Sequence, residues 1–216
     1  MQVEAYLEHD YRIVLPLGST EQHAYLSLET DNLLAERVAA EAAEPLDVLV
    51  LPVLAYGVTP RFAGYPGSPS IGEETYVALL SDLLASLQGQ GFRRILIVNG
   101  HGGNSFAAER VSDDGVIWHD WWNSARIRSL VDQIDPEGSH ASWMENFPWT
   151  RLEGIELPGE HKAPVDLAGI DDPGEYRRAA GDGSFGGYYE RPEEEMLKIW
   201  QAGIEEIRGL LESGWN

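Results

Sequence analysis

The stretch ILIVNGHGGN, residues Ile95–Asn104, decides the fold. It opens with a continuous apolar run, which is typical of a strand buried on both faces of a sheet. The run ends in a glycine-rich turn that contains His101. Glycines permit positive φ and close backbone approach, so this turn can present His101 at the carboxyl edge of the sheet, with N–H groups facing a ligand oxygen. An ordinary strand-to-helix turn and a phosphate loop are the alternatives, but neither GxGxxG nor GxxxxGK[ST] occurs.

The segments around this stretch alternate between strand and helix patterns. Apolar runs of strand length occupy Tyr11–Leu17, Leu46–Leu54, Arg94–Val98 and Val116–His119. Helical spacing of apolar residues occupies Asp31–Glu44 and Glu73–Gln90, a final helix is expected from Pro192 to about Ser213, and Gly181–Gly187 is expected to be a loop. The alternation predicts an α/β domain with a mainly parallel sheet, whose chemistry lies in loops at the carboxyl ends of strands.

Length and composition limit the class of protein. The 216 residues fit a single domain, 1–216, and 43% hydrophobic residues can fill a core. The chain has no cysteine, so a metal would bind to nitrogen and oxygen. A net charge of −21 argues against nucleic acid or an anionic membrane as a partner. The first residues lack a signal-peptide pattern and no run reaches the ~18 apolar residues of a membrane helix, so a cytoplasmic protein is expected.

A first polar cluster follows the first predicted strand, where the segment GSTEQH contains Glu21 and His23, and Asp31 starts the next helix. Side chains two apart in an extended loop point to the same side, so Glu21 and His23 can converge on one ion. Asp31 could bind that ion or bridge two. Alternatively Asp31 caps the helix, with Glu21 solvated and His23 on the surface; Thr30 could also be the cap.

A second cluster is SHASWME, residues Ser139–Glu145, which is expected to form a short helix. His140 and Glu145 would lie about 140° apart around such a helix, so they need not share a face and can have different roles. Taken alone, each is more often structural than functional. His9, His119 and His161 match no ligand position, and Trp118, Trp121 and Trp122 suit core or interface packing better than substrate stacking.

Together these segments resemble the creatininase family, whose members carry a GSxEQHG…TD segment, an NGHGGN or NGHYEN segment and a later HAGxxET-like segment. Further similar pieces are Tyr56-Gly57, the FAGYPG loop at 62–67, GFRR at 91–94 and the glycine-rich loop before the final helix. The resemblance implies a three-layer α/β/α fold with a mainly parallel central sheet. It also implies a homo-oligomer, often a hexamer, with two divalent metal ions (zinc, manganese or iron) in each subunit.

By position, the resemblance makes Glu21, His23, Asp31 and His101 metal ligands, with Asp31 bridging. In the creatininase branch a further carboxylate follows the histidine of the glycine-rich turn by two residues, where this chain has Gly103. Glu145 is the candidate to replace it, because family members with the same turn carry a glutamate after the HAG-like segment. Departures from the family pattern include the run QHAYLSL at 22–28 and Ser142-Trp143 in the third motif.

The implied activity is hydrolysis of a C–N bond in a small amide, cyclic amide or formamide by metal-activated water. His140 matches the family's catalytic histidine, and a side chain with an ordinary pKa near ~6.5 could move a proton from water to the leaving nitrogen. Two other classes remain open. One is a non-catalytic small-molecule-binding protein on the same fold, and the other is a metal-free nucleotide-binding domain.

Overall fold

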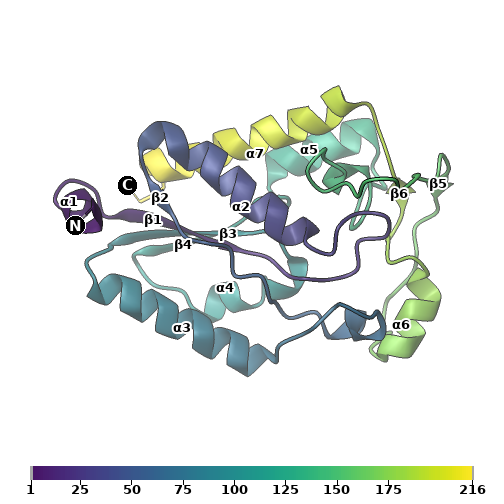
Figure 1. Cartoon of the computed structure of the whole chain (residues 1–216), viewed down its shortest axis with the longest axis horizontal. Coiled ribbons are helices and arrows are strands. Elements are labelled where there is room, and N and C mark those ends of the chain that lie inside the picture. The colour runs from purple at the N-terminus through teal and green to yellow at the C-terminus, as the bar shows by residue number, and fades with distance from the viewer. Residues whose placement is uncertain (1, 216) are drawn as a thin grey trace.

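A computed structural model describes residues 2–215 (Figure 1). Its central sheet has four parallel strands in the order β2-β1-β3-β4. Val14 of β1 pairs with Val50 on one side and with Leu96 on the other, so β1 and β3 lie inside the sheet. The strands are β1 Arg12–Leu17, β2 Leu49–Val50, β3 Arg94–Asn99 and β4 Val116–Asp120.

Helices cover both faces of this sheet. In Figure 1, α2, α5 and α7 lie on one face, and α3 and α4 lie on the other. The expected three-layer α/β/α fold with a mainly parallel sheet is therefore confirmed. The helices are α1 Gln2–Leu7, α2 Thr30–Ala43, α3 Glu73–Gly89, α4 Ala107–Arg110, α5 Ala125–Ile134, α6 Pro173–Ala180 and α7 Glu193–Ser213.

Alternation along the central strands divides the core into two layers. Leu96 and Val98 point to the side of α2 and α7, whereas Ile95 and Ile97 point to the side of α3, and all four are fully buried. Successive side chains of a strand face opposite sides of the sheet, so a strand covered on both faces needs an unbroken apolar run. Each buried side chain of this size contributes about 1.5–3 kcal/mol of hydrophobic stabilisation.

The predicted strand at 46–54 is shortened to Leu49–Val50. From Leu51 to Leu54 this segment advances three residues while its partner β1 advances two, from Val14 to Pro16, so the extra residue interrupts the regular ladder. The chain still follows β1, because Leu51 N donates to Val14 O at 2.9 Å and Leu54 N donates to Pro16 O at 3.0 Å. This segment therefore delivers the loop that follows it to the carboxyl edge of the sheet.

The expectation of a helix over Ser139–Glu145 is wrong. Only Trp143–Glu145 forms one turn of 3₁₀ helix, and Ala141 has a left-handed backbone with φ of 56°. An alanine at positive φ cannot continue a right-handed helix. The structure also contains elements that were not predicted from the sequence, among them α1, α4, α5, α6 and the antiparallel pair β5 His161–Lys162 and β6 Gly187–Tyr188.

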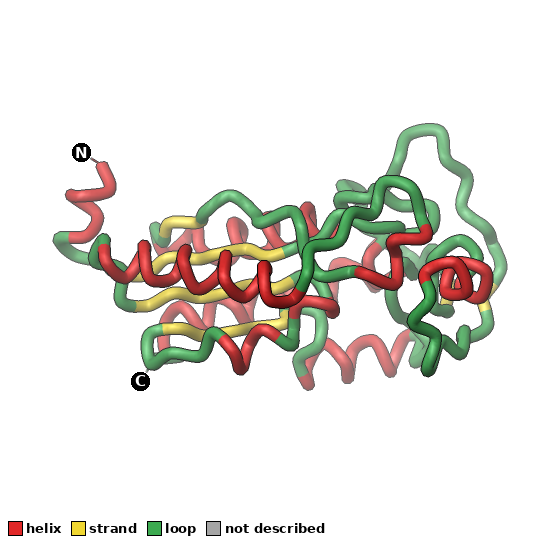
Figure 2. The backbone as a smooth tube through the Cα atoms, turned by 90° about the horizontal axis from the view of Figure 1, so that it is seen from below, coloured by secondary structure: helices red, strands yellow, loops and turns green. Residues whose placement is uncertain are grey.

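Loops after the strands gather at one end of the molecule, away from the end where both chain termini lie (Figure 2). Because all four strands are parallel, their carboxyl ends meet at this edge, where polar residues from different loops can come together. No helix within residues 2–215 has the length and apolar character needed to cross a membrane.

Candidate metal centre

Glu21 and His23 lie in the loop that follows β1, and both are buried. The loop is held by Glu21 N, which donates to Leu28 O at 3.1 Å, and by Leu26 N, which donates to His23 O at 2.8 Å. Ala24 has a positive φ of 50°, so the chain turns sharply directly after His23. A left-handed non-glycine residue is a strained conformation that surrounding contacts must hold in place. Here the turn leaves the two side chains facing the interior.

Asp31 lies in the first turn of α2 and does not cap the helix. The N-cap position is Glu29, which makes no side-chain capping bond, while the Thr30 hydroxyl donates to Ser27 O at 2.6 Å. Asp31 instead extends one carboxylate oxygen to each of two histidines. Its Oδ1 lies 3.0 Å from His23 Nε2 and its Oδ2 lies 2.9 Å from His101 Nδ1.

His101 follows β3 directly, and a hydrogen-bond network holds its backbone. Asn99 donates from its amide to His101 O at 2.7 Å and accepts from His101 N at 3.3 Å. Asp120, at the end of β4, accepts from Asn99 at 2.7 Å and from Ser105 at 3.0 Å. This network aims the His101 ring so that Nδ1 also lies 3.3 Å from Glu21 Oε1.

His140 and Glu145 reach the same cluster from the segment after α5. His140 Nδ1 lies 3.7 Å from Glu21 Oε1, and Glu145 Oε2 lies 3.8 Å from His23 Nε2. Ala141 N donates to Glu145 Oε2 at 2.6 Å, which bends the glutamate back along the segment. In a regular helix these two side chains would diverge, so the left-handed turn at Ala141 is what lets both enter the cluster.

The structure thus brings together all six residues selected from the sequence. Their ligand atoms form three overlapping groups, each within 4.8 Å: Glu21, His23 and His140; Glu21, Asp31 and His101; and His23, Asp31 and Glu145. Asp31 belongs to two groups, one with each of His23 and His101. A carboxylate that offers one oxygen to each of two adjacent groups is arranged as a bridge between two cations.

Each of the three histidines has one ring nitrogen beside a backbone carbonyl. His23 Nδ1 lies 3.0 Å from Glu21 O, His101 Nε2 lies 3.2 Å from Val58 O, and His140 Nε2 lies 3.0 Å from Gln22 O. A proton on that nitrogen satisfies the carbonyl and leaves the other nitrogen with a free lone pair toward the carboxylates. Metal-binding histidines use this arrangement, in which a carbonyl fixes the tautomer.

Two atoms at the centre of the cluster lack hydrogen-bond partners. His23 Nε2 and Asp31 Oδ2 are buried and unsatisfied, although each lies within about 3 Å of a group of opposite character. Their contacts therefore lack hydrogen-bonding geometry. Buried polar atoms without partners are costly, and a cation between them would satisfy both.

The electrostatics of the cluster are dominated by burial and mutual charge. Burial alone would lower the pKa of His23, but Asp31 and Glu145 raise it to about 10. Burial and the neighbouring His23 lower the pKa of His140 to about 4. Burial raises the pKa of Glu145 to about 7, and the charge of Asp31 contributes in the same direction. His140 is thus the neutral imidazole of the group, and Glu145 is its most weakly acidic carboxyl group.

Sequence reasoning missed several residues that hold these side chains. Thr59 donates a short hydrogen bond from its hydroxyl to Glu21 Oε2, and it follows the segment beside β1. Asp120 fixes Asn99, as described above. Only their position in the sequence could have indicated them: Asp120 ends β4, and Thr59 follows the segment beside β1, so both reach the carboxyl edge of the sheet. No motif marks either residue.

A cavity of about 590 Å³ opens beside the cluster. Its walls include Phe62, Phe106, Tyr176 and Phe185 as well as Trp122. The expected packing is seen for all three tryptophans: Trp121 is buried in the core, and Trp118 and Trp122 are partly buried and pack against it. Trp122 also lines this cavity.

The remaining histidines that matched no ligand position belong to none of the three groups found among the described residues. His119 lies in β4, and His161 in β5 packs edge-on against Tyr188.

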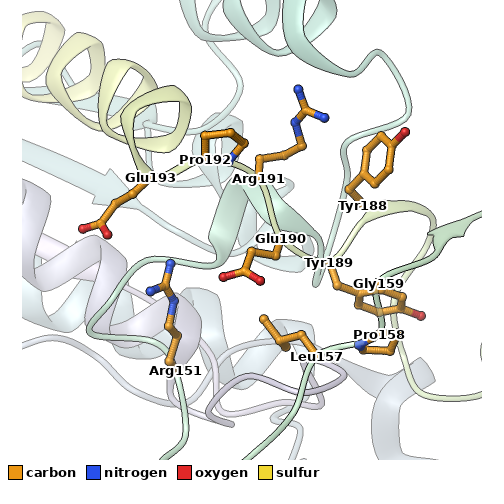
Figure 3. Close-up of a pocket in the computed structure, with 10 residues that line it drawn as sticks. All are labelled: Arg151, Leu157, Pro158, Gly159, Tyr188, Tyr189, Glu190, Arg191, Pro192 and Glu193. Atoms are coloured by element: carbon orange, nitrogen blue, oxygen red, sulfur yellow. The ribbon is translucent and has the colours of Figure 1, made fainter.

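A second cavity of about 450 Å³ lies elsewhere, between the segment 151–159 and the start of α7 (Figure 3). It contains none of the six cluster residues. Arg191 turns its guanidinium away from the centre of this cavity and pairs with Glu195 at 2.9 Å. The histidine–carboxylate cluster therefore belongs to the first cavity alone.

Comparison with known proteins identifies several relatives. The family model described as "Creatininase: Creatinine amidohydrolase" matches residues 1–147. Creatinine amidohydrolase of Pseudomonas putida is 28% identical over 148 residues, which cover 60% of this chain and 57% of that protein. The mycofactocin precursor peptide peptidase of Mycolicibacterium smegmatis is 39% identical over 99 residues, covering 43% of this chain and 40% of that protein. These matches span about half the length of the curated relatives.

Solved structures show the same fold over nearly the whole chain. A crystal structure of creatinine amidohydrolase (creatininase) superposes with a TM-score of 0.77 at 22% identity, covering 99% of this chain and 94% of that one. A structure named creatininase Mn gives 0.78 at 22% identity, with 99% and 95% coverage. At this level of identity the likeness establishes the fold alone.

Proposed function

The chain belongs to the creatininase family, and from that membership we propose that it is a metal-dependent amidohydrolase. Its reaction is the hydrolysis of a C–N bond in a small amide, cyclic amide or formamide. The observation that carries the proposal is the pair of groups that share Asp31, one with Glu21 and His101 and the other with His23 and Glu145.

The residues fit two divalent cations. Nitrogen and carboxylate oxygen ligands suit zinc, manganese and iron, and relatives of known structure include one named with Mn and one named as a Zn-Zn type. The unsatisfied His23 Nε2 and Asp31 Oδ2 are the atoms such ions would satisfy. Bound ions would lower the pKa of water and polarise the amide carbonyl. Glu21, His23, Asp31, His101 and Glu145 are the proposed ligands.

His140 is the proposed proton carrier. Its Nε2 donates to Gln22 O, so Nδ1 is the nitrogen with a free lone pair, and this atom faces Glu21 at 3.7 Å. Neutral imidazole can accept a proton from attacking water and pass it to the leaving nitrogen. Phe62 and Phe185 pack against the ring at centroid distances of 5.0 and 4.7 Å, which fixes its orientation and excludes water from one side.

Elemental analysis tests the metal proposal. Protein purified without chelator or a metal-affinity tag should contain about two equivalents of zinc, manganese or iron. Asp31→Ala should lose most of both, because Asp31 is shared, while the exposed Asp171→Ala should keep them. Wild-type protein that binds no metal after dialysis against these ions would overturn the mechanism and favour a non-catalytic binding protein.

His140→Ala separates the proton carrier from the ligands. We expect this variant to retain metal and lose turnover by about 100-fold or more, the range for removal of a general acid–base group. Intact turnover with metal bound would show that the role assigned to His140 is wrong. Assembly into a homo-oligomer remains a separate prediction, which light scattering of the purified chain would check.

A further inference from the structure

The cavity beside the cluster has an aromatic wall. Phe62, Tyr176 and Phe185 come from three separate segments and pack together, with Phe62 5.3 Å from Tyr176 and nearly parallel to Phe185 at 6.1 Å. Phe106 and Trp122 also line the cavity. Aromatic faces bind flat, polarisable ligands through stacking and edge contacts. The cavity is therefore shaped for a planar group next to the reacting bond.

Two arginines, Arg61 and Arg128, line the same cavity from different elements. Arg61 lies in the 3₁₀ turn Pro60–Gly64, and Arg128 lies in α5. Arg61 pairs with Asp171 at 3.3 Å, a residue whose side chain is 85% exposed. The guanidinium of Arg128 lies 3.8 Å from the carboxylate of Asp132, a distance too long for a hydrogen bond. Exposed ion pairs of this kind contribute little, so a ligand anion can displace them.

The charge of the whole chain makes this placement informative. The sequence has 15 basic residues against 36 acidic ones. Among the cavity-lining residues the carboxylates are Glu21, Asp31 and Glu145, which belong to the cluster, and Glu73. Two divalent ions would more than balance the three cluster carboxylates, and the two arginines outnumber Glu73. Counted over the lining residues alone, the loaded cavity would thus be positive, and an anion that enters it would compete with Asp171 and Asp132 for the two arginines.

We propose that the substrate carries an acidic group, a carboxylate or a phosphate monoester, on a planar body, and that Arg128 and Arg61 determine specificity by binding it. This inference rests on the proposed amidohydrolase function. Guanidinium groups bind both kinds of anion through paired hydrogen bonds. A sphere with the volume of this cavity is about 10 Å across, so one small ligand can span from the cluster to the rim.

Equilibrium binding of unreactive probes tests the anion site without catalysis. The probes are benzoate, phenyl phosphate and the uncharged ketone acetophenone, which has no C–N bond, measured by calorimetry on the metal-loaded protein. We expect at least one anion to bind about 10-fold or more tightly than acetophenone, and the anion that binds more tightly identifies the acidic group. Arg128→Gln should abolish that preference and Arg61→Gln should reduce it.

Arg126→Gln is the matched control, because Arg126 lies on the same helix, is similarly exposed and pairs with Glu205 outside this cavity. This variant should bind all three probes as wild type does. Equal binding of the anions and acetophenone to the wild type, or equal losses in Arg126→Gln and Arg128→Gln, would overturn the proposal.

Hydrolysis separates this proposal from the function on which it rests. N-formylanthranilate and formanilide share an aromatic formamide, but only the first carries a carboxylate. We expect the wild type to cleave N-formylanthranilate at lower KM, and Arg128→Gln to raise that KM about 10-fold while leaving formanilide unchanged. Cleavage of both at one KM would overturn the anion site and leave the amidohydrolase standing. Arginine-dependent anion binding by the metal-loaded protein, without hydrolysis of either formamide, would overturn the amidohydrolase and leave the anion site standing.

Discussion

Replacement of Glu145 by glutamine should stabilise the metal-free protein at neutral and alkaline pH. The carboxyl group is buried against Asp31 and Glu21, and these surroundings raise its pKa from 4.5 to about 7. One pKa unit corresponds to about 1.4 kcal/mol, so keeping this carboxylate ionised in the folded chain costs about 3 kcal/mol. Glutamine occupies the same volume without that charge, and its carbonyl oxygen can still accept from Ala141 N.

The sign follows from proton binding. Between pH 4.5 and 7 the unfolded chain releases the Glu145 proton while the folded chain keeps it, so the free energy of unfolding falls as pH rises. Above pH 7 both states are ionised and the loss is complete. Glu145→Gln should therefore match the wild type near pH 4.5 and exceed it by up to about 3 kcal/mol at pH 8. With metal bound the order should reverse, because a ligand is missing.

Urea denaturation of chelator-treated protein at pH 5 and pH 8, with and without added manganese, measures this difference. Glu153→Gln, at an exposed position, is the control and should change neither curve by more than about 0.5 kcal/mol. If metal-free Glu145→Gln is less stable than the wild type at pH 8, the argument that the ionised Glu145 carboxylate destabilises the metal-free protein is refuted.

Three further predictions concern the surroundings of the cluster. His119 is largely buried, and burial lowers its pKa below 6.5. As pH falls, the unfolded chain therefore binds a proton at this position before the folded chain does, which lowers the free energy of unfolding. In urea titrations, His119→Gln should lose less stability between pH 7 and pH 5 than the wild type. Asp120→Asn places an amide group opposite the donors of Asn99 and Ser105, and competition with a chelator should show metal affinity lower by about 10-fold or more in a folded protein. Adding Gly103→Glu to Glu145→Gln should not restore the second metal equivalent, and elemental analysis that finds it restored would contradict the geometry argued below.

The sequence predicted the central sheet well because its strands carry their own signal. Ile95–Val98 faces apolar side chains on both sides, so an unbroken apolar run is required there. The neighbouring run at 46–54 gave the correct position and the wrong length, because an extra residue between Leu51 and Leu54 interrupts the ladder while further hydrogen bonds keep the chain beside β1. Apolar pattern alone does not distinguish these two cases.

The segments between the last strand of the sheet and α7 were harder to predict. β5 and β6 are two-residue strands held by tertiary contacts, such as Lys162 Nζ, which donates to Ser184 O at 2.7 Å and to Asp182 Oδ1 at 2.5 Å. Such contacts leave no periodic pattern. The same applies to Ala141, which has a left-handed conformation. Glycine is the residue that usually indicates such a conformation in a sequence, and this position is not a glycine. The motif residues predicted which side chains meet, and the local turns decided how.

The proposed replacement of a metal-binding carboxylate at position 103 by Glu145 is consistent with how tightly the glycine-rich turn packs. A Cβ atom built on Gly103 would lie 2.1 Å from Val58 O and 2.4 Å from His101 Nε2. Those two atoms face each other at 3.2 Å and fix the His101 ring. A glutamate at 103 would therefore have to displace the carbonyl that orients His101. With this turn, the proposed further carboxylate has to come from another segment, and Glu145, held by Ala141 N and 3.8 Å from His23 Nε2, can supply it without disturbing the turn.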